Sequence, residues 1–164
     1  MKRLHRSLLI DREPGAVFAL ISDPERASEF FVGLTRWEPR SRRRRGLGAR
    51  FKVLMRVGSI EAGGLVRITG WRPGELIEWE SEAGITQRGR WAIRPATGGT
   101  ELHLQIEFEL EGPGSWLVES IAGRVVGRNM TATLLAVRRM LEFESRPARP
   151  PATAKAKAKA KAAR

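Results

Sequence analysis

The sequence predicts an α+β fold in which a curved antiparallel sheet of about seven strands wraps around one long C-terminal helix. Two observations support this fold class. Apolar and polar residues alternate along most of residues 50–110, which is typical of consecutive antiparallel strands with one buried face. Residues 115–144 form one proline-free segment with helical periodicity, and no other expected helix is long enough to cover the apolar face of the sheet.

Two short helices are expected between the first and second strands. Residues 4–10 alternate as a strand, and Pro14 then begins a helix that stops near residues 22–24. The Asp-Pro pair in that turn starts a second short helix, which ends at Gly33. Both helices are too short to cover a sheet, so we expect them to close one end of the space between the sheet and the long helix.

The rest of the chain up to residue 110 alternates between strands and turns. Residues 40–48 hold five arginines and offer nothing to bury, so they are expected to form a loop. The Gly63–Gly64 pair indicates a bulge or a close approach of two backbones. The clearest strand is the last, in which every second residue is apolar and the alternate face is expected to be wet. The strands are expected at residues 34–38, 50–57, 60–70, 76–82, 85–94 and 100–110.

Three polar residues interrupt the apolar stripe of the long helix. Glu119, Asn129 and Thr133 fall inside or at the edge of this stripe. Burying such groups without partners costs roughly 1–3 kcal/mol each, so they need a polar partner, a water or a ligand. Either a cavity lies behind the helix, or these groups bond to the backbone or to one another in a dry core. The stripe itself is expected to contain Val118, Ala122, Val125, Val126, Ala136, Val137, Met140 and Leu141.

The net charge of +12 is confined to two segments of the chain. Residues 145–164 carry seven lysines and arginines and no acid, and the loop at residues 40–48 carries five arginines, so the remaining residues are neutral. This distribution differs from that of a fold built around phosphate binding, in which basic residues spread over a folded face. We therefore predict a globular domain at residues 1–144 and a disordered Ala/Lys/Pro-rich basic tail at residues 145–164.

Both basic segments are candidates for contact with an anionic membrane surface, a nucleic acid or an acidic protein. A tail that only keeps the protein in solution explains the composition equally well. The candidate contact residues are Arg42, Arg43, Arg44, Arg45, Lys155, Lys157, Lys159 and Lys161.

Several classes of chemistry are excluded or disfavoured by composition. The chain has no cysteine and two histidines, which excludes thiolate catalysis and leaves no cluster of metal ligands, so neither a metal nor a cofactor is expected. Gly46 and Gly48 lack the remaining spacing of a nucleotide-binding loop. No apolar run is long enough for a transmembrane segment or a signal peptide, so we predict a cytoplasmic protein.

The chain resembles the START-like superfamily, also called SRPBCC, and within it the polyketide cyclase/dehydrase and lipid-transport group. The similarity spans about residues 3–144. The residues that carry it are Ile10, Pro14, Val17–Phe18, the run Ile21–Ser22–Asp23–Pro24–Glu25, Gly46 and Gly48 before a strand, Pro95, Gly99–Thr100 and the long closing helix. The resemblance implies a helix-grip fold of the Bet v 1-like type and a cavity between sheet and helix, which relatives use for lipids, polyketides, quinones or plant-hormone-like molecules.

Candidate ligand-binding residues follow from this expected cavity. Aromatic side chains on the strands and short helices favour a flat or chain-like apolar ligand, although each ring also suits a packed core. Polar groups on the long helix are expected to orient the ligand. The candidates are Phe30, Trp37, Phe51, Met55, Trp79, Trp91, Phe108, Val125, Asn129 and Thr133.

Groups suited to general acid–base catalysis are scarce. The chain has no tyrosine, and strand parity places His103 and His5 on the outer face of the sheet. Glu119 is a weak catalytic candidate, since a carboxylate one turn into a helix also complements the helix dipole.

Three function classes follow. The preferred class is binding, or transport, of a hydrophobic small molecule or lipid in the expected cavity. The alternative is an enzyme of the cyclase/dehydrase type, in which Glu119 acts as acid or base and Asn129 or Thr133 holds an enolate oxygen. The third class is a nucleic-acid-associated protein that uses the basic tail.

Overall fold

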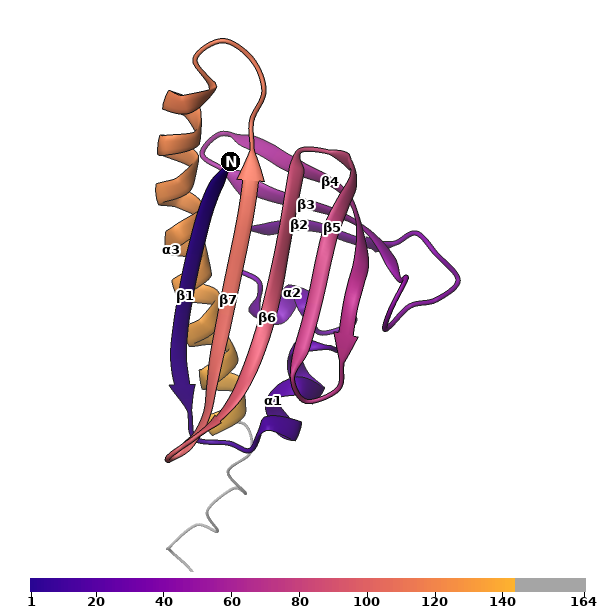
Figure 1. Cartoon of the computed structure of the whole chain (residues 1–164), viewed down its shortest axis with the longest axis vertical. Helices are drawn as coiled ribbons and strands as arrows, with labels where there is room; N and C mark the ends of the chain where they lie inside the picture. Colours follow the sequence, from indigo (N-terminus) through magenta and orange to yellow (C-terminus); the bar gives the residue numbers. More distant parts are fainter. Residues whose placement is uncertain (144–164) are drawn as a thin grey trace, which may run out of the picture.

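The structure is a computed structural model that describes residues 1–143, and its elements follow the predicted order (Figure 1). The strands are β1 (Lys2–Ile10), β2 (Leu34–Pro39), β3 (Arg50–Val57), β4 (Ile60–Arg72), β5 (Leu76–Gly84), β6 (Thr86–Ala96) and β7 (Gly99–Glu109). The helices are α1 (Pro14–Ile21), α2 (Ala27–Phe30) and α3 (Ser115–Phe143). The predicted tail at residues 145–164 lies outside the described residues.

All seven strands belong to one antiparallel sheet with the order β1-β7-β6-β5-β4-β3-β2. The sheet curls, and α3 lies along its inner side next to β1. Helix α1 lies near the lower end of α3, and α2 lies higher, beside its middle part (Figure 1). The predicted helix-grip fold is therefore confirmed. No helix within residues 1–143 has the length and apolarity needed to cross a membrane.

Glycines permit the tightest backbone approaches. A Cβ atom at Gly63 would overlap the carbonyl oxygen of Val53, and one at Gly64 would overlap that of Ala83. These contacts confirm the close approach that the Gly-Gly pair predicted in β4. On α3, a Cβ atom at Gly127 would lie 2.9 Å from the guanidinium of Arg6, so this glycine lets β1 pack closely on the helix.

The alternating pattern of β7 separates core from surface, with one exception. Leu102, Leu104, Ile106 and Phe108 are buried on the side that faces α3. Glu107 lies on the opposite face, which the sequence predicted to be wet, yet it is only 3% exposed. The expectation is wrong at this residue because long arginine side chains from the neighbouring strands cover the carboxylate.

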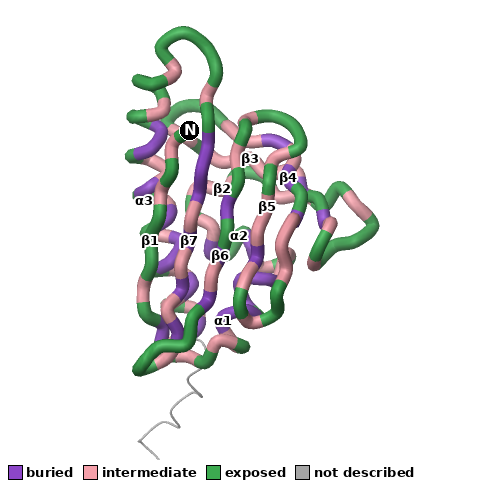
Figure 2. Tube along the Cα trace, in the orientation of Figure 1, coloured by how far each residue is buried: buried purple, intermediate pink, exposed green. Residues whose placement is uncertain are grey.

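The apolar stripe predicted for α3 is buried at Ala122, Val137 and Leu141 and half-buried at Val125, Val126, Ala136 and Met140, but Val118 is 51% exposed. The prediction fails at Val118 because the first turns of α3 extend beyond the end of β1 (Figure 1), where no strand covers them. Figure 2 shows the same change, from exposed residues at the upper end of α3 to buried ones further along. The upper end of the fold is therefore its open end.

Candidate functional site

Two adjoining apolar cavities lie on the inner side of the sheet. The first has a volume of about 80 Å³ and is bounded mainly by aromatic and aliphatic side chains of β2 to β6. The second has a volume of about 110 Å³ and extends between β3, β7 and α3 towards the open end. Val53, Met55, Gln87 and Ile106 line both, so the two cavities are halves of one divided space.

Six of the ten predicted ligand-binding residues line this space. Trp37, Met55, Trp79 and Trp91 line the first cavity. Met55 also lines the second, together with Phe108 and Asn129. These residues come from five strands and one helix, so only the folded sheet brings them together.

The other four predicted residues lie elsewhere. Phe30 is 1% exposed and packs behind Phe31, with 5.2 Å between the two ring centroids. Phe51 is 3% exposed and stacks on Trp37 at 4.6 Å. Neither these rings nor Val125 and Thr133 line the two cavities. Phe30 and Phe51 therefore support the cavity wall from behind.

The aromatic wall of the first cavity has a member that sequence analysis missed. Phe31 lines the cavity and lies between Trp91, at 5.7 Å, and Trp37, at 6.3 Å between ring centroids. Phe31 follows the last residue of α2 directly, and the adjacent pair of phenylalanines was the available signal. Only the angle at which α2 meets the sheet decides which of the two rings reaches the cavity.

Three residues that line this apolar space carry polar groups without partners. The indole Nε1 of Trp37 is buried and has no hydrogen-bond partner. The side-chain amides of Gln87 and Asn129 form no hydrogen bond with any residue within 1–143. Gln87 was not predicted, although a polar residue on the inward parity of β6, shared with Trp91, is a readable signal. Together these groups offer donors and acceptors to a guest molecule.

Two of the three polar residues predicted on α3 have backbone partners instead. The hydroxyl of Thr133 accepts a hydrogen bond from the amide of Val32, at 3.0 Å. The carboxylate of Glu119 accepts one from the amide of Leu110, at 2.9 Å. Glu119 lines neither cavity, and this bond ties the first turns of α3 to the end of β7. Its geometry therefore gives Glu119 a structural role and provides no support for the catalytic one.

Both histidines lie on the outer face of the sheet, as strand parity predicted. His5 Nε2 and His103 Nδ1 are 3.1 Å apart, and the two rings stack with centroids 5.3 Å apart. Burial lowers the pKa of His5, and the positive charges of His103, Arg90 and Arg6 lower it further, against an opposing effect of Glu101. The pair faces away from the apolar cavities and supplies no acid or base to them.

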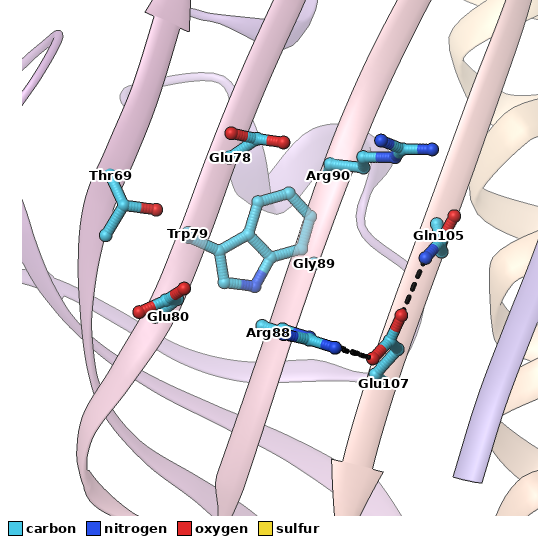
Figure 3. A pocket seen from close by; sticks show the side chains of 9 residues that line it. All are labelled: Thr69, Glu78, Trp79, Glu80, Arg88, Gly89, Arg90, Gln105 and Glu107. Carbon is cyan, nitrogen blue, oxygen red and sulfur yellow. Dashed lines mark hydrogen bonds and ion pairs between the residues drawn. The ribbon is translucent and has the colours of Figure 1, made fainter. Parts of the chain in front are cut away.

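A polar hollow of about 280 Å³ opens on the same outer face, between β5, β6 and β7 (Figure 3). Glu107 is its most buried side chain. Its carboxylate accepts hydrogen bonds from Arg3 at 2.7 Å, Arg88 at 2.8 Å and Gln105 at 2.8 Å. The bond from Arg88 is the largest cause of a lowered pKa of Glu107. This hollow is larger than either apolar cavity, but it surrounds an internally satisfied ionic network.

The basic residues predicted to contact an anionic partner separate into three groups. Arg45 is held against the fold, because its guanidinium donates a hydrogen bond to Ser22 Oγ at 2.5 Å and lies 5.9 Å from the centre of the Trp71 ring. Arg42, Arg43 and Arg44 are exposed, so contact with an anionic partner stays a prediction for them. The remaining candidates, Lys155, Lys157, Lys159 and Lys161, lie outside the described residues.

Within residues 1–143, no three His, Asp or Glu side chains lie close enough to hold a metal ion.

The sequence profile of the family described as polyketide cyclase / dehydrase and lipid transport matches residues 1–142. The chain belongs to this family. A search of curated protein sequences found no match.

Solved structures with low sequence identity share the fold of this family member. TTHA0849 from Thermus thermophilus is 18% identical, with a TM-score of 0.76 over 88% of this chain and 99% of its own. The ZhuI aromatase/cyclase from Streptomyces sp. R1128 is 16% identical, with a TM-score of 0.73 over 88% of this chain and 98% of its own. The di-domain aromatase/cyclase BexL is 17% identical, with a TM-score of 0.65 over 90% of this chain and 48% of its own.

Proposed function

We propose that this protein binds a hydrophobic small molecule in the divided space between the sheet and α3. The observation that carries the proposal is the presence of unpartnered polar groups, on Trp37, Gln87 and Asn129, around a space that is otherwise apolar. An unpaired buried donor such as Trp37 Nε1 is costly, and a guest with a carbonyl or hydroxyl group removes that cost, while the free amides of Gln87 and Asn129 can bond to the same guest. Family membership supports the same function.

The size of the space constrains the guest and its mode of binding. An apolar cavity of roughly 150 Å³ holds one benzene ring. Since the two halves measure about 80 and 110 Å³, a single ring fits only when both are used, and a larger guest must displace side chains. Met55 lines both halves, and its flexible thioether side chain can move out of the boundary between them. We therefore expect the cavity to expand when a flat or chain-like ligand binds.

Native mass spectrometry of the purified full chain, followed by organic extraction, tests this proposal. The expected result is a bound apolar molecule, or stoichiometric binding of a hydrophobic fluorescent dye by the extracted protein. The informative variant is Val126→Phe, because Val126 lines the second cavity. Val125→Phe is the matched control, since Val125 is also half-buried on α3 but lines neither cavity.

Dye affinity should fall at least tenfold in Val126→Phe and stay close to wild type in Val125→Phe. Equal effects of the two substitutions, with the fold intact by circular dichroism, would contradict a site in this space. If the purified protein carries no bound molecule and also fails to increase the fluorescence of the dye, the binding function itself is contradicted.

Catalysis of the cyclase/dehydrase type in the same space is the second candidate. The family description and the aromatase/cyclase neighbours favour it. Asn129, to which the sequence analysis assigned an enolate oxygen, lines the second cavity, whereas Glu119 lines neither. Asn129→Ala should therefore abolish cyclase/dehydrase turnover while a hydrophobic dye still binds. Glu119→Gln should leave both unchanged, because its amide oxygen can still accept the hydrogen bond from Leu110.

A further inference from the structure

The outward face of α3 combines arginines with exposed apolar side chains along its whole length. Residues 117, 121, 124, 128, 135 and 139 recur at spacings that place them on one stripe of a helix. On this stripe, Leu117 is 52% exposed, Ile121 is 58% exposed and Leu135 is 40% exposed. The other three members, Arg124, Arg128 and Arg139, are also exposed. We call this set of six residues the outer stripe.

The charge of the outer stripe has one sign. Arg124, Arg128 and Arg139 form no ion pair with any residue within 1–143. Residues 120–141 contain no acid at all. The two carboxylates of α3 lie towards its ends and are engaged, since Glu119 accepts a bond from the Leu110 amide and Glu142 accepts one from the Asp11 amide. The middle of the helix therefore presents only positive charge to solvent.

The upper end of the outer stripe is enlarged by neighbouring apolar residues. Trp116 is 73% exposed and Val118 is 51% exposed in the first turn of α3. Ile60, at the start of β4, is 58% exposed and lines the same surface hollow as Val118. A cluster of this kind is unusual on a surface in contact with water alone, because large apolar side chains rarely gather there without a partner.

We infer that the outer stripe, with Trp116 at its end, docks on the surface of an anionic phospholipid bilayer. Apolar residues at the end of the helix can enter the boundary between headgroups and acyl chains, where tryptophan is favoured. Guanidinium groups along the same stripe then lie level with the lipid phosphates, to which they bind well. The combination of positive charge with exposed aromatic and aliphatic residues thus matches both layers of the bilayer surface.

Other occupants fit these residues less well. A nucleic acid would use the arginines but has no use for exposed leucine, isoleucine and tryptophan on the same stripe. A symmetric pairing of two copies through this face would bring Arg124 and Arg128 towards the same charges on the second copy. The six residues of the outer stripe and Trp116 line neither cavity, although Val118 and Ile60 beside them also line the second one. The inference therefore does not depend on the proposed ligand-binding function.

Vesicle sedimentation with the full chain tests the inference, using phosphatidylcholine alone and a 7:3 mixture of phosphatidylcholine and phosphatidylglycerol. In the first variant, Arg124, Arg128 and Arg139 are all replaced by glutamine. The matched control replaces Arg42, Arg43 and Arg44 by glutamine, which removes the same charge from an exposed loop. Both variants keep the same tail. Every substituted side chain is exposed, and circular dichroism with the melting temperature verifies that each variant folds.

Partition of the wild-type chain onto the mixed vesicles should exceed its partition onto phosphatidylcholine. The helix variant should lose roughly tenfold in partition, and the loop control much less. The tryptophan emission of the wild type should shift to shorter wavelength on the mixed vesicles, and Trp116→Ala should remove most of that shift while the protein still folds.

Three results would overturn the inference. One is an equal loss of partition in the helix and loop variants, which would assign binding to total charge. Another is vesicle binding without an emission shift that depends on Trp116. The third is a concentration-dependent dimer in light scattering that disappears in Ile121→Asp, which would assign the face to a second copy. Dye binding without vesicles tests the cavity separately, so failure of one proposal is distinguishable from failure of the other.

Discussion

The hydroxyl of Thr133 on α3 accepts a hydrogen bond from the backbone amide of Val32, with 3.0 Å between the two atoms. Val32 lies in the short segment between α2 and β2, and Thr133 is 1% exposed. The bond therefore joins the segment that follows α2 to the buried side of the long helix. It also explains why a polar residue is tolerated within the apolar stripe of α3.

Replacing Thr133 by valine should destabilise the fold by about 1–3 kcal/mol, because the shape is kept while the partly buried amide of Val32 loses its acceptor. The measurement is urea denaturation followed by circular dichroism. Thr131→Val is the control, since Thr131 is exposed and its hydroxyl donates only to the carbonyl of Gly127 in the preceding turn. Its effect should stay within about 0.5 kcal/mol. Equal losses in both variants would remove the structural role assigned to the Thr133–Val32 bond.

The indole ring of Trp79 occupies the space that a side chain at Gly89 would need. A Cβ atom at Gly89 would overlap this ring, and Trp79 lines the first cavity. Gly89→Ala should therefore cost about 1–3 kcal/mol through overpacking. It should also lower dye affinity, because the displaced ring enters the cavity. Gly15→Ala is the matched control, since nothing lies within 4 Å of its Cβ position on α1, and it should leave stability unchanged or slightly raised.

The ionic network of Glu107 predicts an acid-sensitive fold. Its hydrogen bond from Arg88 and those from Arg3 and Gln105 lower the pKa of Glu107 from the ordinary value of 4.5. The carboxylate of Glu107 is therefore protonated more easily in the unfolded chain than in the folded one. The network stabilises the folded protein above about pH 4.5. This contribution is lost as the pH falls through the lower pKa that Glu107 has in the folded state.

Thermal unfolding between pH 3 and pH 7 measures this effect. Glu107→Gln should have a lower melting temperature than wild type at pH 7, and the two curves should converge as the solution is acidified. Glu109→Gln is the control, because Glu109 is exposed and its nearest charged partner is the terminal amine at 4.0 Å. A wild-type and Glu107→Gln difference that stays constant down to pH 3 would contradict the network.

Arg45 should restrain the loop that carries the other arginines. Its bond to Ser22 Oγ and its position over Trp71 tie the loop to the end of α1 and to β4. Arg45→Ala is therefore expected to speed trypsin cleavage after residues 42–44 several-fold, with the cut sites identified by mass spectrometry. Arg43→Ala is the control. It also removes one trypsin site, but it breaks no side-chain bond between the loop and the rest of the fold, so it should not speed cleavage at the remaining arginines. Cleavage at the same rate in both variants would show that the Arg45 tether does not hold the loop.

The sequence alone determined the element order, the length of α3, and which side of most strands faces the core. These features depend on local signals, namely residue periodicity, the proline at the start of α1 and the glycines at turns. His5 and His103 were placed correctly on the outer face for the same reason, because successive side chains of a strand alternate between its two faces. The same alternation contains a signal for Gln87, which the sequence analysis did not use.

Tertiary structure decided which side chains meet at the cavity. Phe30 and Phe31 are neighbours in sequence, but only Phe31 lines the cavity, because the angle between α2 and the sheet fixes which ring points inward. Glu119 and Asn129 were equivalent as polar residues on one helix, yet a strand end supplies a partner to Glu119 and none to Asn129. Periodicity assigns a residue to a face. The partner that it meets there depends on contacts between segments distant in the chain, which a one-dimensional pattern does not encode.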